Sequence, residues 1–399
     1  ALKTEDAHGR NTAVGYEALE MLNAGADGEN VAVGYRAGEE VTEGIQNTLI
    51  GTQAGDALTH ADYNTAVGRN ALSNDTQGHK SVAIGVSALG SQNFTSSTDT
   101  QNTAVGYNCG KSLTTGIRNT LVGHLCGEDL TDSDFNVAIG HGALDADTKG
   151  NRSVAIGYNA LSSQNFTTST DSLNVAVGFG SQIGTTTGTQ NTSVGTNSLN
   201  ASSMTGTGNS VYGYEAANSI TSGAYNTILG RYAADSLTTG AYNTNIGNDT
   251  DVSAADVQFA VAIGHSAVDK GTNTGFITPT SGVYQGNNNA SWSTTSDIRI
   301  KKNVTDNNIG LDTINKIQVK NFEYRTEDEI VDFDNPKSAV VKKEGVQLGV
   351  IAQEIQSILP DVVTEQSTGV LAVNPDNITW YLVNAVKELS AEIKKLKGE

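Results

Sequence analysis

A short motif centred on glycine recurs along the first two thirds of the chain. NTAVGYEAL (11–19), NTAVGRNAL (64–72), SVAIGVSAL (81–89) and SVAIGYNAL (153–161) are copies of one unit. Its glycine occurs fifteen times between residues 15 and 264, most often 17 residues apart. Short β-branched runs with a period near 20 residues are typical of a solenoid, whose repeats contact only their neighbours. The sequence therefore predicts an all-β stack of about 15 coils.

The columns of the repeat predict how each coil is built. The residue before the glycine is Val or Ile in 13 of 15 copies, which predicts an inward-facing β position. Asn stands four residues before the glycine in 12 of 15 copies, and stacked Asn side chains can hydrogen-bond from coil to coil. The glycine allows a tight turn or the close approach of a neighbouring backbone.

Two of the steps are 21 residues long because they hold nearly identical inserts, SQNFTSSTD (91–99) and SQNFTTSTD (163–171). Phe94 and Phe166 occupy equivalent places on these inserts. An exposed ring there could stack on a sugar, which makes both residues candidate receptor contacts. The alternative is that each ring fills the groove between neighbouring chains.

Composition and charge limit the function classes. The chain has 399 residues and a formal net charge of −19, which disfavours a nucleic-acid surface because such surfaces need clustered Lys and Arg. We find no apolar run of 18 residues and therefore expect no membrane span. No phosphate-binding loop or nucleophile elbow is present, and we expect no cofactor.

The repeat contains one pair of cysteines and one pair of histidines that could form a functional site. Cys109 and Cys126 are 17 residues apart in a column that otherwise holds small residues, which predicts buried thiols in place of Ala. His124 and His141 are also 17 apart, directly after the glycine. We expect an exposed column there rather than a two-His metal site, since no established metal spacing is present.

Catalysis by the shaft is not predicted. A glycosidase needs two carboxylates held about 5–10 Å apart. The acidic residues here lie mostly in turns, as in GEDLTDSD (127–134), where Asp usually has a structural role.

The repeat resembles the head domain of trimeric autotransporter adhesins over roughly residues 11–268, on the strength of motifs such as NTAVG and SVAIG. That resemblance implies a left-handed parallel β-roll in which three chains pack together. We assign residues 1–268 to the shaft and 269–292 to a connector rich in Gly, Asn and Thr.

From residue 293 the sequence reads as a small α+β domain. QVKNFEYRTED (318–328) predicts a strand, and 344–363 predicts a strand followed by a helix that ends at Pro360. Residues 374–399 predict a long helix capped by Asn374 or Asp376. Its apolar positions have the spacing of a coiled-coil seam: Ile378, Leu382, Ala385, Leu389, Ile393 and Leu396.

The segments SDIRIKKNV, LGVIAQEI, LPDVV and LVNAVKEL resemble the intramolecular chaperone auto-processing domain of phage tail spikes, tail fibres and endosialidases. The resemblance covers 293–399. It implies a domain that assembles three chains, drives folding of the preceding fibre and then releases itself through a Ser-Lys dyad.

Carried over to this sequence, the resemblance makes Ser296 the nucleophile and Lys301 the general base. The cut is expected next to Ser296, with the bond between Ser296 and Asp297 favoured and the bond before Ser296 as the alternative. A Ser hydroxyl needs a base, and a Lys can act as one where burial lowers its pKa. Five residues along an extended strand span too great a distance for direct contact. The segment must therefore fold back, form a helical turn, or pair between chains.

Together these features predict a homotrimeric phage tail fibre or tailspike that binds a host-surface glycan or lipopolysaccharide. We expect it to join an upstream tail or baseplate protein, to be assembled in the host cytoplasm and to reside in the virion. The only enzymatic activity expected is a single-turnover serine endopeptidase that cuts its own chain. The alternatives are a cell-surface trimeric adhesin, a fibre that retains its trimerisation domain, and a glycan-degrading tailspike.

Overall fold

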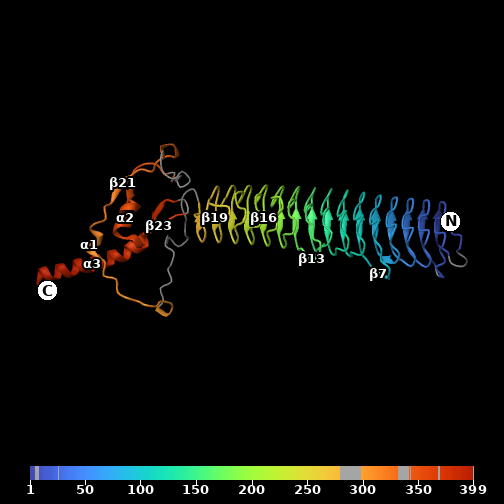
Figure 1. Cartoon of the computed structure of the whole chain (residues 1–399), viewed down its shortest axis with the longest axis horizontal. Helices are drawn as coiled ribbons and strands as arrows, with labels where there is room; N and C mark the ends of the chain where they lie inside the picture. The colour runs from blue at the N-terminus through green and yellow to red at the C-terminus, as the bar shows by residue number, and fades with distance from the viewer. Residues whose placement is uncertain are drawn as a thin grey trace. The chain divides into compact units, whose positions relative to one another are not determined.

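The computed structural model describes residues 1–4, 9–25, 27–278, 298–330, 341, 343–366 and 369–398. The chain divides into two compact units, Ala1–Thr280 and Ser281–Glu399. The first is the stacked unit seen in blue to yellow in Figure 1, and the second is drawn in orange to red.

The first unit is a solenoid built on one 16-stranded sheet in which every neighbouring pair of strands is parallel. The strands follow one another in chain order, one per coil, and pair in register, so that Ala83 lies opposite Ala104. They are β1 (Thr12–Val14), β2 (Val31–Val33), β3 (Thr48–Ile50), β4 (Thr65–Val67), β6 (Val82–Ile84), β8 (Thr103–Val105), β9 (Thr120–Val122), β10 (Val137–Ile139), β12 (Val154–Ile156), β14 (Val175–Val177), β15 (Thr192–Val194), β16 (Ser210–Tyr212), β17 (Thr227–Leu229), β18 (Thr244–Ile246), β19 (Val261–Ile263) and β20 (Gly275–Ile277).

The predicted parallel solenoid is confirmed, and it extends one strand further than the repeat indicated. Strand β20 lies within 269–292, the segment predicted to be a connector, and it pairs with β19. The motif fades there, but the backbone still continues the sheet.

The direction of the Val/Ile column was predicted wrongly. The side chains before the glycine point outward in the chain: Val14 is 58% exposed and Ile50 is 38% exposed. From β2 to β19 of this sheet the central residue of each strand, such as Ala32 or Leu49, is buried instead. Because side chains alternate along a strand, burying the central residue turns its two neighbours outward. The thin coil is filled by Ala, Leu and Cys side chains.

The predicted Asn ladder is present and buried. The backbone N–H of Asn47 donates to Oδ1 of Asn30 at 2.9 Å, and the N–H of Asn64 donates to Oδ1 of Asn47 at 2.9 Å. Each Asn side chain also donates to a carbonyl of the next turn, as Asn47 Nδ2 does to Ala61 O at 2.8 Å. The ladder thus pairs polar groups that would otherwise be buried without partners.

Each 21-residue coil adds a small second sheet. In the first, β5 (Gly78–His79) pairs with β7 (Thr98–Asp99), and in the second, β11 (Gly150–Asn151) pairs with β13 (Thr170–Asp171). A buried carboxylate anchors each insert: Asp75 Oδ2 accepts from Gln92 Nε2 at 2.5 Å, and Asp147 Oδ2 accepts from Gln164 Nε2 at 2.6 Å.

The second unit is a small α+β arrangement. Its elements are η1 (Ile298–Ile300), α1 (Leu311–Ile314), β21 (Lys320–Phe322), η2 (Glu327–Glu329), β22 (Gln347–Gly349), α2 (Ala352–Ile358), η4 (Pro360–Val362), β23 (Val363–Glu365), β24 (Leu371–Val373) and α3 (Pro375–Lys397). Strands β21 and β22 are antiparallel, as are β23 and β24. Ile355, Leu359, Val362 and Tyr381 form its core.

Helix α3 begins and ends as its sequence predicts. The side chain of Asn374 accepts from the N–H of Asp376 at 3.0 Å, so Asn374 is the N-cap. Gly398 closes the helix in the left-handed conformation. None of the helices in the described part of the chain combines the length and apolar character needed to cross a bilayer.

Candidate functional site

The structure describes the segment predicted to carry self-cleavage only from Ile298 onward. Ser296 and Asp297 lie outside the described residues. Lys301 directly follows the helical turn η1, and its backbone N–H donates to Ile298 O at 3.2 Å. Its side chain is exposed, as is every residue from 301 to 309. We call this exposed segment, residues 301–309, the strap. Within one chain, the side chain of Lys301, the predicted base, is therefore exposed to solvent.

Helix α3 holds the far end of the strap. Asn384 Nδ2 donates to Asn307 O at 2.8 Å and to Ile309 O at 3.2 Å. A carboxylate oxygen of Glu388 accepts from the N–H of Leu311 at 2.7 Å, at the start of α1. A negative side chain there satisfies a free N–H and complements the helix dipole. Helix α3 thus fixes the strap at residues 307–311.

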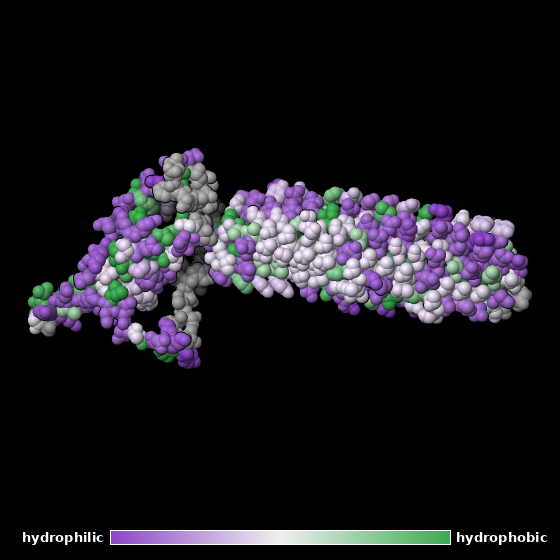
Figure 2. All heavy atoms as spheres, viewed as in Figure 1, coloured by the Kyte–Doolittle hydropathy of each residue, from purple (hydrophilic) through white to green (hydrophobic). Residues whose placement is uncertain are grey.

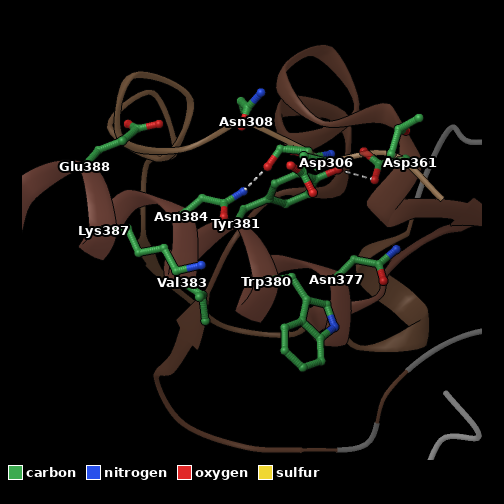
Figure 3. A pocket seen from close by; sticks show the side chains of 12 residues that line it. Asp306, Asn308, Asp361, Asn377, Trp380, Tyr381, Val383, Asn384, Lys387 and Glu388 are labelled. Atoms are coloured by element: carbon green, nitrogen blue, oxygen red, sulfur yellow. Dashed lines mark hydrogen bonds between the residues drawn. The ribbon is translucent and has the colours of Figure 1, made fainter. Parts of the chain in front are cut away.

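A cavity of about 800 Å³ lies between the strap and α3 (Figure 3). On its floor the hydroxyl of Tyr381 donates to Asp361 Oδ2 at 2.5 Å, and this hydrogen bond raises the pKa of Tyr381. Trp380 projects from the same helix and is 69% exposed. The lining is mostly amide and carboxylate groups and also includes Thr305 and Lys387.

The opposite side of α3 carries an exposed apolar seam. Its members are spaced 4-3-4-3, the pattern of a coiled coil: Leu382, Val386, Leu389, Ile393 and Leu396. Each is at least 44% exposed in the chain. The seam predicted from sequence contained Ala385, which the structure instead buries at 5% exposure. Val386 takes that place in the seam.

Comparison with known families identifies this unit. Residues 296–364 match a family model described as chaperone of endosialidase. The C-terminal unit carries a chaperone-of-endosialidase domain. No curated protein and no solved structure matches the chain.

The match begins at Ser296 and ends within β23, so it includes the strap, α1, β21, β22 and α2 and stops before α3. A chaperone-of-endosialidase domain implies assembly of three chains. Its position behind a β-solenoid fits a tail fibre or tailspike.

Phe94 and Phe166, the candidate receptor contacts, are buried within the solenoid. Their exposures are 8% and 6%, and the backbone N–H of Phe94 donates to Asp75 Oδ1 at 2.9 Å. A ring needs an open face to stack on a sugar, so their interpretation as exposed contacts does not fit. The insert folds back onto Asp75 of the preceding coil. The sequence of the nine-residue insert did not reveal this contact.

The two cysteines occupy the core as predicted. Cys109 and Cys126 are free and fully buried, and Cys126 Sγ donates to Ala138 O at 3.0 Å. The neighbouring Cys109 thiol and burial raise the pKa of Cys126. A thiol that resists ionisation is a poor nucleophile, which agrees with a packing role.

The two histidines belong to an exposed stack of five rings. Tyr107, His124, His141, Tyr158 and Phe179 stack in that order, with centroids 5.0–5.2 Å apart. The imidazole planes of His124 and His141 differ by only 9°, so their nitrogen lone pairs run side by side and do not converge on one ion. Each inner ring has both faces covered, so the stack presents ring edges. The repeat register could have revealed the whole column, because all five residues follow the glycine.

Three carboxylates near the first coils come within metal-binding distance of one another: Glu17, Glu20 and Glu39. Lys3 pairs with Glu20 at 2.8 Å and Arg36 pairs with Glu17 at 2.7 Å. These two cations already balance most of the negative charge, and we assign no metal to the cluster.

The stability of the solenoid should depend on pH through Asp56. This residue lies one coil after Glu39 and Glu40, whose charges act on it. Burial raises the pKa of Asp56 to about 6, and Oδ1 has no hydrogen-bond partner within the described residues. The folded chain therefore binds this proton more tightly than the unfolded chain, so stability falls as the pH rises from 3.8 to about 6 and the full penalty persists at higher pH. Asp56→Asn should raise the free energy of unfolding by about 1–2 kcal/mol at pH 7.5, after allowance for partial exposure.

Because the carboxyl is protonated in both states at low pH, the gain should vanish below pH 4. Urea unfolding of both chains at pH 7.5 and pH 3.5 measures it, with the exposed Asp256→Asn as control. An equal gain in the free energy of unfolding at both pH values would show that ionisation of Asp56 does not destabilise the folded chain.

Proposed function

We propose that the chain is a subunit of a homotrimeric phage tail fibre or tailspike. In this proposal the chaperone domain assembles three chains and is then released by self-cleavage. The observation that carries it is an apolar stripe along the outer face of the solenoid sheet, in a chain that also matches the chaperone-of-endosialidase family at residues 296–364.

The stripe consists of the residues before the repeat glycines, one per coil. Several are more than a third exposed: Val14, Ile50, Ile84, Ile139, Val194, Tyr212 and Leu229. Monomeric soluble proteins rarely expose a continuous apolar patch this long. By contrast, the face of the solenoid seen in Figure 2 is mainly hydrophilic or intermediate, with small separate hydrophobic patches. Packing of three chains through the stripe would remove it from water.

A repetitive solenoid also needs a register. A chain shifted by one whole coil would place similar residues opposite one another, so stripe packing discriminates weakly between alignments. The seam on α3 and the chaperone domain are not repetitive. Trimerisation there would align the three chains before the coils pack.

Self-cleavage would then depend on assembly. The side chain of Lys301 is exposed in one chain, and a Lys acts as a base only in a site that lowers its pKa. A neighbouring chain would supply that burial. Ser296 remains the proposed nucleophile, and the bond between Ser296 and Asp297 remains the proposed site of hydrolysis.

The test compares the parent chain with Ser296→Ala, Lys301→Ala and the matched control Lys302→Ala, by denaturing gel and intact mass. The parent and Lys302→Ala should each yield fragments ending at Ser296 and beginning at Asp297. The two dyad variants should stay whole. A parent that stays whole while forming trimers would contradict self-cleavage and favour a fibre that retains its trimerisation domain.

Co-expression of the two dyad variants separates the remaining arrangements. If the base acts on a neighbouring chain, Lys301→Ala chains should be cut when they share trimers with Ser296→Ala chains. If the dyad lies within one chain, neither should be cut.

After release, the shaft would bind a host-surface glycan or lipopolysaccharide and join an upstream tail or baseplate protein in the virion. Adsorption of the cleaved trimer to bacterial cells, followed by depletion from the supernatant, tests the binding step.

A further inference from the structure

Two guanidinium groups lie against one exposed phenyl ring in the middle of the solenoid. Arg118 Cζ is 5.3 Å and Arg152 Cζ is 5.7 Å from the centroid of the Phe135 ring. The three residues occupy equivalent positions on successive coils, each directly before a residue of the Asn ladder column. The ring is therefore flanked by a cation from each neighbouring coil, at a separation suited to cation–π attraction.

The two arginines differ in their other partners. Arg152 Nη1 pairs with Asp171 Oδ2 at 2.6 Å. Arg118 donates from Nε to Gln101 Oε1 at 3.0 Å, and within the described residues no carboxylate pairs with it. The Gln101 contact, made through Nε, and the Phe135 ring together orient the Arg118 guanidinium. Arg118 is thus an oriented cation without an ion pair within 4.0 Å in the described residues, although Lys80, together with the charges of His79 and Arg118, lowers the pKa of Asp99 in the first insert.

The two inserts stand at the two ends of this row. Lys80 pairs with Asp99 of the first insert at 2.6 Å, and Arg152 pairs with Asp171 of the second. Each insert exposes short hydroxyl side chains: Thr95, Ser96 and Ser97 in the first, and Thr167, Thr168 and Ser169 in the second. Hydrogen-bonding groups thus border the cations on both sides.

We infer that Arg118, Phe135 and Arg152 form a binding site for the carboxylate or phosphate groups of an acidic polysaccharide. A guanidinium presents paired N–H donors that match both groups. The two arginines are two coils apart, about 10 Å, which suits two acidic groups on one extended chain. Hydroxyls of the inserts would bind the neutral part of the sugar.

The site lies beside the apolar stripe, just before the start of each strand. Polar margins of an interface stay in contact with solvent when its apolar centre is covered. The site would therefore stay accessible in the trimer. The inference rests on the proposed host-surface binding and names the ligand class for it.

The test measures binding of the intact trimer by calorimetry, with oligogalacturonate as the carboxylate probe, tripolyphosphate as the phosphate probe and maltoheptaose as the neutral one. Arg118→Gln, which keeps a polar side chain of similar reach, should weaken oligogalacturonate binding at least about tenfold. Phe135→Leu should weaken it less. The matched control is Arg231→Gln, because Arg231 also lies over a ring, 4.3 Å from the centroid of Tyr232, but has no second guanidinium opposite.

Equal weakening by Arg118→Gln and Arg231→Gln would overturn the inference, since it would indicate general electrostatic attraction. An affinity for maltoheptaose equal to that for oligogalacturonate would also overturn the inference. So would binding of oligo(dT) that is as tight as that of oligogalacturonate and is lost in the same variants. If only the tripolyphosphate response depends on Arg118, the acidic group is phosphate. Failure of the site in a trimer that still forms, cleaves and adsorbs to cells would leave the proposed function standing.

Discussion

Gly123→Ala is expected to break the solenoid at its centre. Gly123 has φ +146°, a conformation that residues with a Cβ rarely adopt, and an added Cβ would collide with the carbonyl oxygen of Gly140 on the next coil. Neither backbone can move away, because β9 and β10 are paired in register around these glycines. Strain and overlap together should cost at least about 3–4 kcal/mol.

Thermal and denaturant unfolding followed by circular dichroism measure this loss. Gly275→Ala is the matched control, since Gly275 lies in β20 of the same sheet, has an ordinary φ and has no atom within 4 Å of an added Cβ. Equal stability of the two variants would show that the close approach of the glycines is not required.

Leu389→Asp is expected to abolish trimer formation. Leu389 lies in the middle of the exposed seam on α3, where three copies would meet in the proposed trimer. Burying a Leu contributes about 1.5–3 kcal/mol per chain, and three carboxylates brought together would repel one another in addition. Without alignment by α3, the shafts should associate out of register or aggregate.

Sedimentation or light scattering of the intact chain gives the oligomeric state. Ala391→Asp adds the same charge two residues away, outside the seam, and should remain trimeric. A trimeric Leu389→Asp would show that other surfaces hold the chains together and would remove α3 from the assembly step. Self-cleavage should fail together with the trimer if the dyad is completed by assembly.

Much of the architecture follows from local patterns. The glycine spacing set the coil number within one, because each coil is a unit that repeats its own turn and strand. The Asn column predicted the buried ladder, since an Asn at the same place on each coil can satisfy the next backbone N–H. Motifs around residues 296–364 were specific enough to indicate the chaperone domain, which the family match supports independently.

Three features depended on tertiary structure. Alternation shows which side chains share a face of a strand, but the face that turns inward depends on how the coil closes, and here most of the buried side chains are Ala and Leu. Phe94 is buried because its insert folds back onto Asp75, a residue from the preceding coil. Val386 is in the seam because it is exposed, whereas Ala385 is buried within the chain, and helical spacing by itself cannot distinguish the two.

For the candidate sites, too, some features followed from the sequence and others only from the tertiary structure. The sequence by itself determined the coil stack, its ladder, and the identity of Ser296 and Lys301 as the predicted dyad. Only the tertiary structure placed Lys301 in solvent, left the Val/Ile stripe uncovered and set Arg118 and Arg152 around Phe135. The physical reason is that a repeat encodes contacts between a residue and its equivalent one coil away. Which surfaces stay exposed depends on how the whole coil closes.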